Sequence, residues 1–250
     1  MRYKPHTLSA EEERLIASAT EIFGASGRIF SQLSNADLAF PEIEVDGEKK
    51  SLSHASFVLF LKNHDRSVRE RAFNEYYRVY DQHRNTIAAA LAGSVKKDVF
   101  LAQTRRYDSA LTQALFADNI APAVYDNLLA AVSRNLEPLH RYYELRRKRL
   151  GLNKLRIYDT YVPLVPEVSI RHTYEEAVLL AAEALQPLGP EYVDVLVQGL
   201  THQRWVDRYE NKGKRSGAYS SGCFDSYPYI LLNYKEDDIG SVFTLLHEAG

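Results

Sequence analysis

The side chains best suited to chemistry lie near the end of the sequence, where His247 is followed directly by Glu248. A zinc peptidase binds its metal through the pattern H-E-x-x-H on a helix. Histidines at i and i+4 share one helix face there, and the glutamate beside the first can act as a general base. The second histidine position falls just beyond Gly250, so the sequence holds only the first half of this pattern. By itself a His-Glu pair is a weak signal, because a lone histidine on an apolar helix is more often a packed core residue than a metal ligand.

The residues around this pair predict the helix that the pattern needs. Apolar residues recur at helical spacing, and Asp237 or Asp238 is suited to cap the helix start. The apolar face is formed by Val242, Leu245, Leu246 and Ala249. We therefore expect both side chains to lie on a final helix, with His247 one turn after Phe243.

Three stretches of the sequence resemble a known family. They are Lys214–Asp225, Tyr227–Tyr234 and Val242–Gly250, and in this order and spacing they closely resemble oligoendopeptidase F of the thimet-oligopeptidase-like zinc metallopeptidases, family M3. The segment Leu150–Leu164, which reads GL..L..YD.YVPL, resembles the same family. The resemblance covers essentially the whole chain.

The resemblance implies a fold and an activity. The fold is mostly α, a multi-helix array with a small β-sheet near the C-terminus, as part of a clam-like enzyme with a deep channel. The activity is zinc-dependent endopeptidase hydrolysis of short oligopeptides, while folded proteins are excluded. His247 would be a zinc ligand, and Glu248 would be the catalytic residue that polarises the attacking water.

The same resemblance implies a substrate-binding strand. Gly217, Ala218, Tyr219 and Ser220 would lie at the channel edge and pair with the peptide backbone, a mode known as β-augmentation. Gly217 and Ala218 are small, as a close backbone approach requires.

The chain also departs from the family, whose members are longer at both ends. The second histidine, the third ligand (a glutamate on the next helix) and the downstream histidine and tyrosine residues have no counterpart here. We therefore expect an internal or truncated piece, with residues 1–60 as the remainder of an N-terminal lobe and 61–250 as the start of the catalytic domain. One zinc ligand does not make a site, so the chain alone is expected to be inactive. The alternative is a non-catalytic, peptide-binding helical module, and a third hypothesis is an inert fragment.

Other candidate chemistry has weaker support. Cys223 with His202 or His247 could form a thiol nucleophile pair, but a cysteine is more often a small buried hydrophobe, and its neighbours fit packing better. No phosphate-binding G-x-x-x-x-G-K-[ST] loop is present.

Two basic stretches raise the question of an acidic partner. Residues Arg134–Lys154 fit a solvated helix face, with Leu136 and Leu139 inward, better than a nucleic-acid patch. Lys212, Lys214 and Arg215 lie beside the predicted substrate strand, where they could meet a peptide carboxylate or form an exposed loop.

Composition supports an ordered globular chain. Lys and Arg number 31 against 33 Asp and Glu, a net charge of −2, which disfavours a nucleic-acid partner bound through a global basic field. A single cysteine excludes an internal disulfide and favours a reducing compartment, so we expect a cytoplasmic location. No apolar run is long enough for a membrane span, and the N-terminus lacks a signal peptide, so no membrane partner is expected.

Several local signals predict the elements that would carry these residues. Capping boxes are expected at Ser9–Glu12, Ser67–Glu70 and Thr173–Glu176. A hairpin is expected in Phe40–Ser53 around Asp46-Gly47. Long helical stretches are expected over Asp65–Ala117, interrupted near Gly93, and over Pro122–Leu150, which ends at Gly151. An extended segment is expected at Asn153–Val168, and strands at Ala218–Ser221 and Tyr229–Tyr234.

Overall fold

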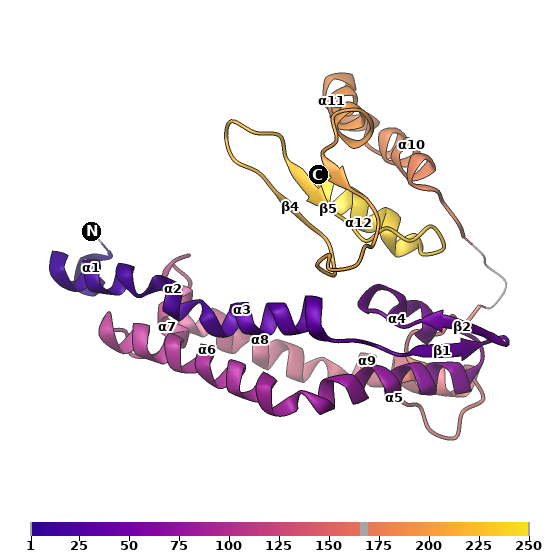
Figure 1. The fold of residues 1–250 in the computed structure, drawn as a ribbon, viewed down its shortest axis with the longest axis horizontal. Helices are drawn as coiled ribbons and strands as arrows, with labels where there is room; N and C mark the ends of the chain where they lie inside the picture. The colour runs from indigo at the N-terminus through magenta and orange to yellow at the C-terminus, as the bar shows by residue number, and fades with distance from the viewer. Residues whose placement is uncertain (1, 166–169, 250) are drawn as a thin grey trace. The chain divides into compact units, whose positions relative to one another are not determined.

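The computed structural model describes residues 2–165 and 170–249 (Figure 1). It is mostly helical with two small sheets, as predicted. The chain forms two compact units, which alternate along the sequence. The first unit comprises the residues up to Ala39 together with Tyr77–Thr160, and the second comprises Phe40–Tyr76 and the chain from Tyr161 onward. The predicted division after residue 60 stays a prediction.

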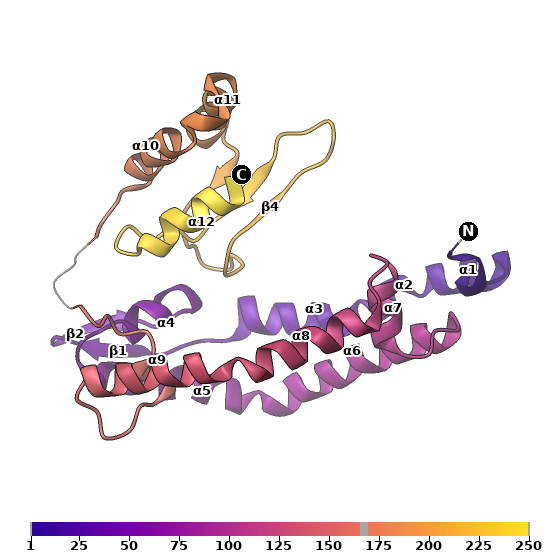
Figure 2. The same ribbon diagram turned by 180° about the vertical axis from the view of Figure 1, so that it is seen from behind.

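The first unit consists of helices. They are α1 (Ala10–Ser18), α2 (Thr20–Phe23), α3 (Ala25–Gln32), α6 (Arg84–Thr104), α7 (Ala110–Phe116), α8 (Pro122–Arg134) and α9 (Leu136–Arg149). Short turns of other helix types lie at Lys4–His6, Leu33–Asp37 and Ile157–Asp159. Seen from behind, α8 and α9 follow one another end to end (Figure 2). The capping box predicted at the start of α1 is confirmed, because Ser9 Oγ accepts the Glu12 N–H at 3.3 Å and the Glu12 carboxylate accepts the Ser9 N–H at 2.9 Å.

Gly93 lies where two helices of the first unit meet. α6 runs through it without a break, so the predicted interruption is wrong. A Cβ at Gly93 would lie 3.2 Å from Ser26 Cβ, so the glycine allows α3 to approach α6 closely. Figures 1 and 2 both show α3 lying along α6.

An ion pair fastens α1 to the end of α6. Arg105 donates from both terminal nitrogens to the two carboxylate oxygens of Glu13, at 2.7 and 2.8 Å. These hydrogen bonds hold the pKa of Glu13 below its usual value. Beside them the His6 ring stacks on Tyr107 with 3.7 Å between ring centroids.

Helix α5 (Arg66–Gln82) contributes residues to both units. The capping box predicted at Ser67 is wrong, because the helix already begins at Arg66 and Ser67 lies inside it. Asp65 caps it instead, accepting the Ser67 N–H at 2.8 Å and the Ser67 hydroxyl at 2.9 Å. These bonds lower the pKa of Asp65. The chain turns again at His83, before α6 begins.

The predicted extended segment Asn153–Val168 contains a short 3-10 turn at Ile157–Asp159. Asp159 is fully buried. Its carboxylate accepts the Arg156 N–H at 2.9 Å, and its main-chain oxygen accepts a hydrogen bond from Arg146 at 3.3 Å. The end of the segment, from Pro166, lies outside the described residues.

The second unit begins with the predicted hairpin. Strands β1 (Glu42–Val45) and β2 (Glu48–Ser51) pair antiparallel, with Val45 opposite Glu48. Asp46 and Gly47 form the turn with φ of 55° and 79°, the left-handed region that asparagine, aspartate and glycine tolerate. Helix α4 (His54–Leu61) follows. The hairpin, α4 and α5 share a core of Ile43, Val45, Leu52, Phe60, Val68 and Ala72.

In the described part of the chain from residue 170 to 249, the second unit combines three α-helices with a three-stranded sheet. The helices are α10 (Tyr174–Ala184), α11 (Pro190–Thr201) and α12 (Ile239–Ala249). The strand order is β3-β5-β4, with β3 (Val206–Asp207) parallel and β4 (Tyr219–Ser221) antiparallel to β5 (Tyr229–Leu231). The predicted strands thus correspond to β4 and β5, whereas β3 was not predicted. The buried core between helices and sheet consists of Tyr174, Ala177, Val178, Leu196, Leu200, Ile230, Leu232, Tyr234, Val242 and Leu245.

Because of two tyrosines in this core, we expect the folded protein to lose stability at high pH. The Tyr174 hydroxyl donates to Leu200 O at 3.1 Å, and the Tyr234 hydroxyl donates to His172 O at 3.0 Å. Burial raises the pKa of each phenol to about 12, from 10.0. The folded state therefore favours the protonated phenols. Their contribution to stability is complete below pH 10 and lost as the pH rises to about 12.

The expected result is a urea unfolding midpoint that falls steeply between these two pH values. Replacing both tyrosines by phenylalanine, which does not ionise, should flatten that part of the profile. An equally steep fall in the double variant would show that other groups cause the loss.

Candidate functional site

Helix α12 carries His247 and Glu248, as predicted. Asp238 caps its start, accepting the Gly240 N–H at 3.0 Å on its side chain and the Ser241 N–H at 2.8 Å on its main-chain oxygen. A hydrogen bond from the Lys235 N–H to Ser241 Oγ at 3.0 Å fixes the first turn from the preceding chain.

One face of α12 is buried and the opposite face is open. Val242 and Leu245 lie in the core, and Leu246 and Ala249 pack against it. His247 is exposed and Glu248 is half-buried. Phe243, one turn before His247, is 66% exposed. The helix therefore uses its apolar face for packing and leaves the imidazole accessible to a ligand.

The predicted substrate segment lies at an edge of the sheet. Tyr219 and Ser220 belong to β4, and Gly217 and Ala218 lead into it. Within the described residues β4 pairs only with β5, so its other edge has unpaired backbone groups. Ala218 packs against the same core as α12, and α12 contacts β4. The tertiary structure thus brings the predicted substrate segment and the predicted catalytic helix together.

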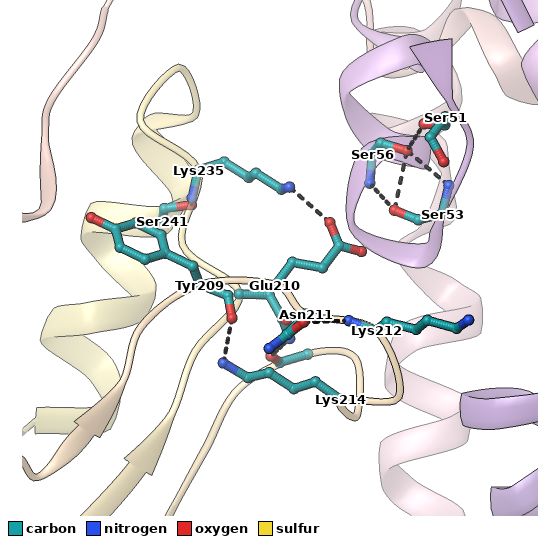
Figure 3. Close-up of polar contacts among 12 residues, drawn as sticks. Ser51, Ser53, Ser56, Tyr209, Glu210, Asn211, Lys212, Lys214, Lys235 and Ser241 are labelled. Carbon is teal, nitrogen blue, oxygen red and sulfur yellow. Dashed lines mark hydrogen bonds and ion pairs between the residues drawn. The ribbon is translucent and has the colours of Figure 1, made fainter. Parts of the chain in front are cut away.

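The lysine beside this segment has an internal role. Lys214 Nζ donates to the main-chain oxygens of Tyr209 and Asp207 at 2.6 and 3.1 Å and pairs with the Asp207 carboxylate at 3.0 Å. Its side chain is only 7% exposed. Figure 3 shows Lys214 directed at Tyr209, and Lys235 directed at Glu210. Lys214 therefore closes the loop before the strand, and this geometry argues against its meeting a peptide carboxylate.

The other basic stretch is also engaged internally. Arg147 forms a bidentate pair with Glu144 at 2.8 Å for both contacts and donates to Leu152 O at 2.7 Å. The hydrogen bonds from Arg147 to the Glu144 carboxylate lower the pKa of Glu144 to about 2. The predicted inward positions of Leu136 and Leu139 are wrong, since both are exposed.

Two cavities adjoin the sheet. One, of about 360 Å³, is lined by Gly217 and Ala218 and by Ser241 and Thr244 of α12. The other is larger and open, about 1070 Å³, and its lining includes Trp205, Tyr219 and Cys223. The smaller one joins the predicted substrate segment directly to α12.

Cys223 is exposed, so the expectation of a small buried hydrophobe is wrong. Its thiol lies 3.2 Å from Ser226 Oγ and 3.5 Å from Asp225 Oδ1. Neither His202 nor His247 lines the cavity that Cys223 borders. The geometry therefore gives no support to a thiol–imidazole pair.

The described residues do not complete a metal site. Within residues 2–165 and 170–249, no three His, Cys, Asp or Glu side chains are grouped so as to hold an ion. His247 is the one predicted ligand, and a protein zinc site uses three or four. The described residues therefore supply one ligand of such a site.

The comparison with protein families identifies the chain. The family model for Peptidase family M3 matches residues 59–250. The chain belongs to this family. A second family model, Oligopeptidase F, matches residues 1–40. The resemblance inferred from the three sequence stretches is confirmed.

Individual members of the M3 family are similar over nearly the whole chain. Oligopeptidase PepF of Bacillus subtilis (strain 168) is 47% identical over 248 residues, which are 99% of this chain and 37% of that protein. An oligoendopeptidase F homolog of Borreliella burgdorferi is 43% identical over 250 residues, 100% of this chain and 42% of that protein. The chain thus spans about two fifths of the length of these relatives.

Solved M3 peptidase structures share the fold. The crystal structure of oligoendopeptidase-F from Enterococcus faecium has a TM-score of 0.65 and 43% identity, covering 81% of this chain and 38% of that one.

Among the helices that the structure describes, none has the length and apolarity of a membrane span.

The structural roles of two residues were not predicted from the sequence. For Lys214 the sequence predicts either a contact with a peptide carboxylate or an exposed loop, and for Asn233, which lies in the resembling stretch Tyr227–Tyr234, it predicts no role. The local sequence carries no signal for either role, because the partners of both side chains include main-chain oxygens that only folding brings close.

Proposed function

We propose that this chain is part of a zinc-dependent endopeptidase that hydrolyses short oligopeptides. The observation that carries the proposal is the contact between α12, which holds His247 and Glu248, and β4, whose outer edge is unpaired within the described residues, in a chain of family M3. The chain has a single cysteine, which favours a reducing compartment, so a cytoplasmic location stays a prediction.

In this proposal the peptide binds as an added strand. The free edge of β4 offers main-chain N–H and C=O groups to an extended partner, which supplies affinity without demanding a particular side chain. Gly217 and Ala218 leave room for that backbone to approach. Short peptides are extended at little cost, whereas a folded protein seldom has a free extended segment to offer.

His247 and Glu248 take different roles. The exposed imidazole of His247 would supply one metal ligand, and the remaining ligands would come from outside the 250 residues. A zinc ion held there would lower the pKa of a bound water molecule. Glu248, directly beside the ligand, would accept the proton of the attacking water and pass it to the leaving amine.

The test uses the full-length protein that contains these residues and a series of fluorescent peptides of increasing length. We expect short peptides to be cleaved. Cleavage should stop when a zinc chelator is added and return when zinc is restored. A folded protein that contains the same peptide sequence should stay intact. Peptide binding without cleavage, unaffected by the chelator, would instead support the non-catalytic peptide-binding module.

A further inference from the structure

We propose that Asn233 is a positioning residue that holds the segment Gly217–Ser220 in the shape needed to pair with a peptide. The inference rests on the proposed function, because it assigns the peptide to the β4 edge. It adds a residue whose side chain acts through the backbone of the substrate strand.

The Asn233 side chain makes two hydrogen bonds to this segment. Its Nδ2 donates to Gly217 O at 2.8 Å and to Arg215 O at 3.0 Å. Both partners are main-chain carbonyls, which only accept, so the amide must present its NH₂ group to them. The two N–H bonds of that group serve the two carbonyls, and the amide bridges two residues of the loop.

These bonds begin where the backbone ladder between β4 and β5 ends. Tyr219 lies opposite Leu231 in the last paired position. Continuing the antiparallel register by two residues places Gly217 opposite Asn233. The side chain therefore replaces the next backbone hydrogen bonds, at a residue where the chain turns: Gly217 has a φ of 83°, in the left-handed region.

The backbone of Asn233 is itself held from the other side. The N–H of Leu232 donates to Asp207 O at 2.8 Å, and the N–H of Tyr234 donates to Arg208 O at 2.9 Å. Leu232 and Tyr234 are also buried in the core. Asn233 thus lies between two fixed residues, and its side chain reaches the chain at Arg215 and Gly217.

The bridge also lies next to α12. Asn233, Gly217 and Ala218 line the cavity of about 360 Å³ together with Ser241 and Thr244 of that helix. A displacement of Gly217 would therefore change the position of a β4-bound peptide relative to α12. Losing the bridge should weaken productive peptide binding while leaving His247 and Glu248 unchanged.

The decisive variant is Asn233→Asp in the full-length protein. Aspartate keeps the shape of the side chain but replaces two donors by a charged acceptor that repels both carbonyls. We expect KM for a short peptide to rise by roughly tenfold while kcat changes by less than about threefold. Amide hydrogen exchange in Ala218–Ser221 should accelerate by a similar factor, roughly tenfold.

A matched control removes the same kind of bond elsewhere. Asn135 Nδ2 donates to Ala131 O at 2.7 Å in the first unit. Asn135→Asp is expected to leave KM and exchange in Ala218–Ser221 as in the wild type. Asn233→Ser, which removes the amide donors without adding charge, is expected to act like Asn233→Asp and replaces it if that variant does not fold.

The outcomes separate the two proposals. Unchanged KM and unchanged exchange in Asn233→Asp and Asn233→Ser would overturn the role of Asn233, as would a parallel loss of kcat with general destabilisation. If the wild-type protein binds but does not cleave peptides, the endopeptidase proposal fails. Hydrogen exchange and peptide affinity then still decide whether Asn233 holds the strand.

Discussion

Replacing Glu248 by glutamine in the full-length protein is expected to reduce peptide hydrolysis by roughly 10²–10⁴-fold. Glutamine has nearly the same shape as glutamate but does not accept a proton at neutral pH, so general-base assistance is lost. His247 is unaffected, and the zinc content should equal that of the wild type. The measurement is kcat for a short peptide, with zinc determined on the same preparation.

The control is Glu183→Gln, the same change on an exposed residue of α10. It should leave both activity and zinc content unchanged. An active, zinc-loaded Glu248→Gln protein would remove Glu248 from the mechanism. Loss of zinc would show instead that Glu248 acts in metal binding.

The second large effect is expected on stability, from Gly199→Ala. Gly199 lies in α11, and a Cβ there would overlap the indole carbons Cδ2 and Cε3 of Trp205. Trp205 is only 8% exposed, and its main-chain N–H donates to Gly199 O at 3.2 Å, so the backbone that carries the buried ring is tied to the same residue. Overpacking of this kind costs about 1–3 kcal/mol, more than the roughly 1 kcal/mol that alanine gains in helix propensity.

Urea unfolding of the 250-residue chain measures this directly, because Trp205 is its only tryptophan and reports on the site by fluorescence. The matched control is Gly27→Ala in α3, where a Cβ meets nothing within 4 Å. This control should stabilise the chain by about 0.5–1 kcal/mol. A Gly199→Ala chain as stable as the control would contradict the predicted clash.

The elements that were predicted correctly depend on residues close together in the sequence. The Ser9 and Thr173 capping boxes each join residues three apart, and both are formed. The Asp46-Gly47 turn joins adjacent strands through two residues that tolerate positive φ. Ser67 shows the limit of such predictions. Asp65, two residues earlier, caps the helix instead, and its carboxylate accepts hydrogen bonds from both the main-chain N–H and the hydroxyl of Ser67.

The sequence by itself therefore determined the family, the helical fold class and the helix that bears His247 and Glu248. Only the tertiary structure decided the sheet order, in which β3 pairs parallel to a strand more than twenty residues later. It also decided the internal role of Lys214 and the bridge from Asn233 to Gly217. The reason is physical: these contacts join groups whose distance depends on how the intervening loop closes, and residue type and local spacing carry no information on that closure.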